Sequence, residues 1–173
     1  DLVRSRGLGD VYKRQAMDCY ILPCEYMGFD TTSIASSDTF AALQTGVVEG
    51  LAGSTPAGAY LNYRDIIDYY YVYQMSPEVT QIMISEKTLA KLSPEDQKTI
   101  VDICRQECAN SVNYAKEEDE KYLKLMEDNG IKIVRFTDEE IEMFAEAVRT
   151  NVWPQLAKTY GEDFINELLK LYK

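Results

Sequence analysis

The sequence predicts an α/β fold in which one helix is much longer than a single small domain requires. Short apolar segments alternate with amphipathic ones along most of the chain, which is typical of strands connected by helices. A helix-start signal at Ser93-Pro94 is followed by no helix breaker until Asn129-Gly130. Such a helix is about 50 Å long, whereas a small domain is about 30 Å across. We therefore expect one lobe of a two-lobed protein, with a helix that spans both lobes and with the N-terminal lobe missing.

The first fifteen residues differ in character from the rest. They carry four basic residues, show no helical or strand period, and resemble the sequencing-adaptor read-through found in assembled metagenomic reading frames. We assign 1–15 as a non-native or disordered segment and 16–173 as the domain, the alternative being a native basic arm. Without that segment the net charge changes from −11 to −13, which argues against a nucleic acid partner because phosphate contacts need clustered Lys and Arg.

The first half of the domain is predicted to alternate helices with short strands. Ser36 or Ser37 caps a helix that buries Phe40 and Leu43, and Gly46 ends it. The remaining segments are a helix over 16–28 closed by Gly28, strands at 31–34 and at Val47-Val48, a helix from Thr55-Pro56 to about Ile67, and strands over 68–75 and 78–85.

The second half is predicted to be mostly helical. A brief helix over 86–91 precedes the long helix, whose apolar stripe runs through Ile100, Cys104, Cys108, Val112, Ala115, Tyr122 and Met126. A strand over 131–136 follows, and Thr137 with Glu140 forms a capping box for a helix that Pro154 must break or kink. A last helix over 162–172 directs Phe164, Ile165, Leu168 and Leu171 inward.

The chain has no histidine and four cysteines, which restricts its chemistry. It lacks the commonest general base and the usual metal ligand. Cys104 and Cys108 lie four residues apart, on one helical face with poor disulfide geometry, so core packing is favoured over a zinc site. We expect no metal and no cofactor. A thiol-dependent enzyme with Cys24 or Cys104 as nucleophile remains an alternative, and it has no evident base.

Several motifs resemble, in order, the solute-binding proteins of the tripartite ATP-independent periplasmic (TRAP) transporters, the dicarboxylate-binding receptor family. The resemblance covers residues 16–173 and rests on "MGFDTTSI", "SSDTFAALQTGVVEG", "KLSPEDQKTI" and "MEDNGIKIVRF". It implies a receptor that closes about a hinge on a small organic acid, outside the cytoplasmic membrane, and delivers it to TRAP membrane subunits. The family's signal peptide would be absent here because the N-terminus is truncated. The family's carboxylate-binding arginine falls at Lys13, which we do not count as a site residue.

The resemblance also implies a ligand site around the glycine-rich turn after residue 50. It places contacts near Gly53 and Ser54 and in the loop around Gln74, and the helix opened by Thr55-Pro56 would present its positive end to an anion. The resemblance also places a contact at Ser36, before the "ALQ" helix, and we add Tyr60 and Gln74, which could reach the cleft from the adjoining helix and strand. The predicted substrate-binding residues are Ser36, Gly53, Ser54, Thr55, Tyr60 and Gln74. The family commonly has Asn-Pro after its "DG", whereas this chain has "LAGSTP", so its ligand is expected to differ from the best-known acids.

A third class of function is a protein-interaction module that uses the acidic face of the long helix. The run "KEEDEKY" at 116–122 carries this reading, and a solvated helix face is the simpler explanation. Neither this alternative nor the thiol enzyme requires a cofactor.

Overall fold

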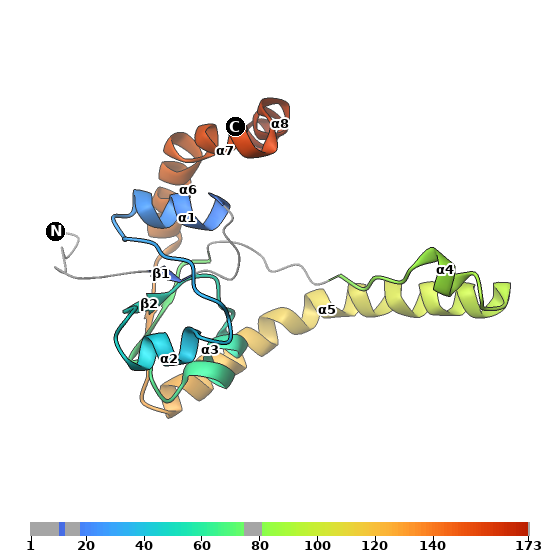
Figure 1. The fold of residues 1–173 in the computed structure, drawn as a ribbon, viewed down its shortest axis with the longest axis horizontal. Coiled ribbons are helices and arrows are strands. Elements are labelled where there is room, and N and C mark those ends of the chain that lie inside the picture. Colours follow the sequence, from blue (N-terminus) through green and yellow to red (C-terminus); the bar gives the residue numbers. More distant parts are fainter. Residues whose placement is uncertain (1–10, 13–17, 75–80, 173) are drawn as a thin grey trace.

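The computed structural model describes residues 11–12, 18–74 and 81–172, and these form an α/β arrangement of eight helices and four short strands (Figure 1). The elements are β1 Val11–Tyr12, α1 Asp18–Tyr26, α2 Thr39–Gln44, β2 Gly50–Leu51, α3 Pro56–Tyr63, β3 Tyr69–Val72, α4 Glu86–Leu89, α5 Pro94–Asp128, β4 Lys132–Arg135, α6 Asp138–Asn151, α7 Trp153–Tyr160 and α8 Glu162–Lys170. None of these helices combines the length and the hydropathy that crossing a membrane requires.

The strands pair in parallel, two by two. β1 pairs with β2, and β3 pairs with β4 with Tyr69 opposite Lys132 and Val72 opposite Arg135. Parallel neighbours need a crossover connection, and here α5 is part of the connection between β3 and β4. Side chains alternate along β3, so Tyr69 and Tyr71 are about half exposed while Tyr70 and Val72 pack against the core.

The main core lies where α3 and the last turns of α5 meet the β3–β4 pair. Its buried residues are Ala59, Leu123, Met126 and Ile131, and Met126 is fully enclosed. The apolar stripe of α5 reaches this core only at its C-terminal end. The sheet, α3 and α5 therefore share one hydrophobic centre.

A second cluster joins the C-terminal helices to α1. Val152, Leu156 and Ile165 are buried there, and Leu22 of α1 packs against them. Two polar contacts fix α1 in place: the Thr159 hydroxyl donates to Asp18 at 2.6 Å, and the Asn151 amide donates to the Tyr26 hydroxyl at 3.0 Å. The last three helices thus hold α1 in place.

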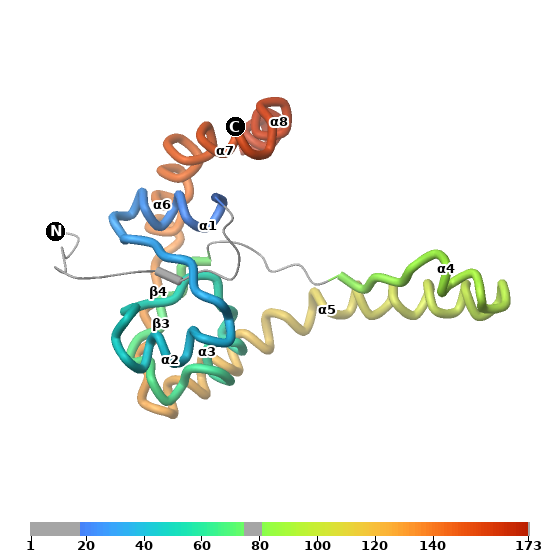
Figure 2. The backbone as a smooth tube through the Cα atoms, in the orientation of Figure 1, coloured from blue at the N-terminus to red at the C-terminus, as the bar shows by residue number. Residues whose placement is uncertain are grey.

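Helix α5 extends far beyond the body of the molecule, as the sequence predicts. Its outer end lies beside α4, and its inner end runs under α3 (Figures 1 and 2). Between these ends, every residue from 111 to 121 is exposed, with Val112 at 70%. The predicted apolar stripe is therefore exposed to solvent in the middle section of the helix.

The helix-start signals of the sequence are confirmed at three sites. The side chains of Thr55, Ser93 and Thr137 each accept a hydrogen bond from the backbone three residues later, and Thr137 with Glu140 completes the predicted capping box. The helical segment is interrupted between α6 and α7, and Pro154 lies in the first turn of α7. Strands β3 and β4 and helix α4 also lie where they are predicted, with shorter bounds.

The predicted strand at Val47-Val48 is wrong, and the strand β2, Gly50–Leu51, lies three residues further on. Both valines donate their amides to the Ala42 carbonyl, at 2.9 and 3.3 Å, so they close the end of α2 and are not free to pair with a strand. Gly46 has a φ of +72° and ends that helix as predicted. Val48 is nevertheless buried, whereas Val47 is 65% exposed.

The start of α2 also differs from the prediction. Asp38, not Ser36 or Ser37, is its N-cap, and it makes no side-chain capping bond. The Thr39 hydroxyl donates to the Ala35 carbonyl at 3.1 Å, which turns Thr39 and Ala42 inward and leaves Phe40 exposed. The buried face of α2 therefore includes Thr39 in place of the predicted Phe40.

Other expected elements are shorter or absent. The segment 31–34 forms no strand beyond a single bridge at Thr31, because its side chains are largely exposed and have no sheet to cover. Residues 81–85 are not a strand, and 78–80 lie outside the described residues. Helix α3 ends at Tyr63, although Ile67 still packs on the core. In α8, Ile165 and Leu168 face inward, but Phe164 and Leu171 are exposed because α7 covers only one narrow face.

The segment 1–15 is described only at β1. Its two strand residues were not expected, because the segment shows no strand period in the sequence. The rest of the segment lies outside the described residues.

Candidate functional site

The candidate site is the turn that leads from β2 into α3. Gly53 has a φ of +85°, a conformation that favours glycine, and it reverses the chain after the strand. Thr55 then caps the helix: its hydroxyl oxygen accepts the Gly58 amide hydrogen at 3.1 Å. Pro56 is the first helical residue, as its fixed φ favours. The turn therefore presents the positive end of α3 next to two hydroxyl groups.

Two tyrosines hold this turn in position. The Tyr70 hydroxyl donates to the Ser54 carbonyl oxygen at 2.9 Å, which ties the turn to β3. The Tyr20 ring of α1 lies only 3.4 Å from where a Cβ on Gly53 would stand. Gly58 is more tightly confined: a Cβ there would lie 2.9 Å from the Ser54 hydroxyl oxygen, whereas the Tyr20 ring is at ordinary van der Waals distance from a Cβ on Gly53. A fixed, closely packed turn of this kind keeps its polar groups oriented without a bound ligand.

The arrangement is suited to binding an anion. Backbone N–H groups at a helix N-terminus and nearby hydroxyls donate hydrogen bonds to carboxylate or phosphate oxygens. Ser54 and Thr55 are half-buried, so an anion bound there would be partly shielded from water. The Ser54 hydroxyl donates to the Thr55 carbonyl oxygen at 3.3 Å, a long bond that a ligand could replace.

The structure brings three of the six predicted site residues together in this turn, namely Gly53, Ser54 and Thr55. Tyr60 lies one turn further along α3 and faces α5: its ring centroid is 5.8 Å from that of Tyr122, and it packs on the main core. These contacts indicate that Tyr60 packs between α3 and α5.

The other two predicted residues lie on separate connections. Ser36 is exposed, two residues before the N-cap of α2. Gln74 is exposed after β3 and has a φ of +50°, in the left-handed region that a non-glycine residue rarely adopts. Strained residues of this kind cluster at functional sites.

Sequence reasoning missed Tyr20 and Tyr70 as supports of the turn. Tyr70 lies in a run of tyrosines that reads as one face of a sheet, and its inward position in the period-2 alternation of β3 was the available signal. Tyr20 carried no signal, because its position over Gly53 depends on how α1 packs in three dimensions.

The Cys24 side chain has the opposite character to a catalytic thiol. It is 2% exposed, and burial, reinforced by the nearby Glu25 carboxylate, raises its pKa from 9.0 to about 11. Thiolate is the reactive form, so this environment suppresses nucleophilic chemistry. Cys104 is half-buried and Cys108 is exposed, and all four cysteines are free. In the described part of the chain, no three metal-ligating side chains gather into a metal site.

We expect thiol labelling at pH 8 to modify Cys108 rapidly and Cys24 hardly at all in the folded chain, with equal labelling of both in urea.

Because folding raises the Cys24 pKa, the thiol stabilises the fold fully below pH 9 and loses that contribution as the pH rises toward 11. Melting temperature measured across this range should fall less steeply in Cys24→Ala than in the parent chain. Fast labelling of Cys24 in the folded chain would contradict the packing assignment.

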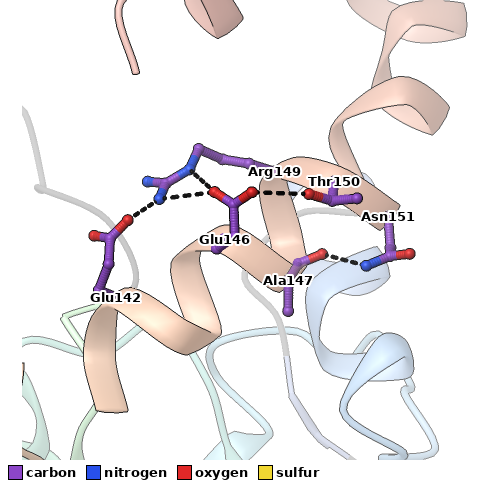
Figure 3. Close-up of polar contacts among 6 residues, drawn as sticks. All are labelled: Glu142, Glu146, Ala147, Arg149, Thr150 and Asn151. Atoms are coloured by element: carbon purple, nitrogen blue, oxygen red, sulfur yellow. Dashed lines mark hydrogen bonds and ion pairs between the residues drawn. The ribbon is translucent and has the colours of Figure 1, made fainter. Parts of the chain in front are cut away.

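The positive charges of two arginines are balanced by glutamate side chains of the same chain. Arg149 is only 12% exposed and contacts Glu142 and Glu146 on its own helix (Figure 3). Its guanidinium carbon lies 5.0 Å from the Tyr172 ring centroid. Arg135 forms a two-pronged pair with Glu120, at 3.1 and 2.9 Å. Neither guanidinium is therefore free to anchor a ligand carboxylate.

The acidic run at 116–122 behaves as a solvated helix face. Glu118 pairs with Lys121 at 2.8 Å, and the Arg135 hydrogen bonds to Glu120 hold the pKa of that carboxyl below its usual range. Its charges are thus partly balanced within the chain. This charge balance favours a solvated helix face over a protein-interaction surface for residues 116–122.

Comparisons with known proteins identify the family of this chain. The model of the bacterial extracellular solute-binding proteins, family 7, matches residues 16–159. A search of curated proteins gave no match.

Solved structures of TRAP periplasmic solute-binding proteins share the fold. One from Escherichia fergusonii, in an apo open form, has 20% identity and a TM-score of 0.72 over 91% of this chain and 51% of its own. One from Shewanella oneidensis, with bound succinate, has 18% identity and a TM-score of 0.70 over 94% and 52%. One from Sulfitobacter sp. NAS-14.1, with bound β-D-galacturonate, has 23% identity and a TM-score of 0.65 over 92% and 52%. The chain spans about half the length of these proteins, and it belongs to the bacterial extracellular solute-binding proteins of family 7.

Proposed function

We propose that this chain is one lobe of an extracytoplasmic receptor that captures a small organic acid and delivers it to the membrane subunits of a TRAP transporter. The observation that supports the proposal is the turn at Gly53–Thr55, in which the Ser54 and Thr55 hydroxyls adjoin the capped N-terminus of α3. Family membership supplies the receptor class, and carboxylates are bound in the related structures from Shewanella and Sulfitobacter.

The receptor acts by binding and release, without chemistry on its ligand. The raised pKa of Cys24 supports this part of the proposal, because a protonated, buried thiol is a poor nucleophile. An organic acid would place its carboxylate against the positive end of α3, with Ser54 and Thr55 as hydroxyl donors. Gln74 and Ser36 would contact the rest of the ligand from the neighbouring connections.

Nuclear magnetic resonance titration tests this site on the chain as it exists. Succinate added to high millimolar concentration should shift the amide signals of Gly53, Ser54 and Gly58 in fast exchange. Ser54→Ala should reduce these shifts, whereas the control Ser111→Ala, on the exposed section of α5, should leave them unchanged. Shifts confined to other parts of the chain would overturn the proposed site, and so would the absence of any shift.

A further inference from the structure

The joint between α5 and β4 contains the sequence's one Asn-Gly pair, Asn129-Gly130. Asn129 is the C-cap of α5, and Gly130 turns the chain toward β4 with a φ of +88°. The Asn129 side-chain amide donates to the Arg64 carbonyl oxygen at the end of α3, at 3.2 Å. This exposed hydrogen bond therefore fastens the ends of two helices that share the main core.

Asn-Gly is the dipeptide best suited to spontaneous deamidation. The Gly130 backbone nitrogen loses its proton and attacks Cγ of Asn129, and the new N–C bond closes a succinimide ring. The Cγ–Nδ2 bond then breaks, and the side-chain NH2 group takes up a proton and leaves as ammonia. Water then opens the ring to aspartate or to isoaspartate. Glycine at the second position leaves the attacking nitrogen uncrowded, and no oxidant or cofactor is needed.

We infer that Asn129 is a self-modification site whose rate is set by the contact between α3 and α5. Three features of the fold oppose the reaction. The Gly130 N–H donates to the Glu127 carbonyl at 2.9 Å, the Asn129 amide is held on Arg64, and the Asn129 ψ of 1° is fixed by the helix cap. The nitrogen and Cγ can meet only when this joint opens locally.

An aspartate or isoaspartate at position 129 destabilises the connection between α5 and β4 and its contact with α3. A carboxylate at position 129 cannot donate to the Arg64 carbonyl, so two acceptors face each other. It also adds negative charge at the negative end of the α5 dipole, beside Glu127 and Asp128. The isoaspartate form lengthens the backbone by one atom just before Ile131, which is 4% exposed and leads directly into β4. Conversion therefore loosens α3 from α5 and disturbs the register of the sheet.

The test is peptide mass spectrometry of the purified chain held at mildly alkaline pH, in buffer and in urea. Asn129 should gain the mass of an amide-to-acid conversion in buffer, ahead of the five other asparagines, and about tenfold more slowly than in urea because the joint must open. An unmodified Asn129 in buffer would overturn the inference, and equal rates in the two conditions would overturn the role of the α3 contact.

Two variants test the consequence of the modification. Asn129→Asp should melt below Asn129→Ala, because the alanine removes the donor without adding a charge. Both should melt below the parent chain. The control Asn166→Asp lies in the middle of α8 and should not show the additional loss of amide protection at the ends of α3 and α5. Equal melting of the aspartate and parent chains would overturn the proposed effect.

Discussion

Replacing Met126 by alanine is expected to lower the free energy of unfolding by about 2–5 kcal/mol. Met126, in the last turns of α5, has no exposed surface and belongs to the same core cluster as Ala59 of α3 and Ile131, the residue that leads into β4. Truncation removes the transfer energy of the side chain and leaves a cavity, because the rigid helix and sheet around it cannot collapse fully. Urea denaturation followed by circular dichroism measures the change.

The matched control for this experiment is Met143→Ala on α6. Met143 is 56% exposed, so its truncation removes little buried surface and should change stability by less than about 0.5 kcal/mol. Similar losses in the two variants would show that Met126 does not lie at the centre of a core.

The purified chain is expected to give no one-to-one binding isotherm in the micromolar range with small organic acids. Ligand pockets bury about 70–90% of a ligand's surface, and one lobe leaves much of that surface in water. Arg135 and Arg149 are paired with glutamates, so neither guanidinium is free to bind a ligand carboxylate. Charge-assisted hydrogen bonds contribute about 1.5–3 kcal/mol each, so a site without a free guanidinium binds at least about tenfold more weakly than one that has it.

Isothermal titration calorimetry with succinate, glucuronate and galacturonate checks this expectation. A clean micromolar isotherm would show that this lobe carries the whole site. Weak shifts in the magnetic resonance titration remain compatible with the expected result, because they report millimolar contact at the same turn.

The sequence predicts best those elements whose signals are local. Ser93, Thr55 and Thr137 fix helix starts through hydrogen bonds within one turn, and nothing distant competes with them. The length of α5 follows from the same kind of signal. The resemblance of "ALQTGVVEG" and "LSPEDQ" to TRAP receptors adds the family, which the comparisons confirm.

The failures come where tertiary contacts decide. Val47 and Val48 favour a strand by composition, but the end of α2 uses their amides first. Residues 81–85 have strand composition and gain no partner strand among the described residues. In the candidate site, the turn at Gly53–Thr55 was visible in the sequence, whereas the Tyr20 and Tyr70 supports depend on packing across the fold.

The pairing of β3 with β4 has a consequence for how the chain folds. Tyr69 and Lys132 are neighbours in the sheet but are separated by the whole of α4 and α5 in sequence. Contacts so distant along the chain cost loop-closure entropy before they gain any stability, and folding rates fall as such contacts come to dominate. Helix α5 forms from local contacts and shortens the effective loop, so early formation of its C-terminal turns brings the two strands within reach. The rate of folding should therefore be more sensitive to helix propensity near Leu123 than to substitutions at the exposed tyrosines of β3.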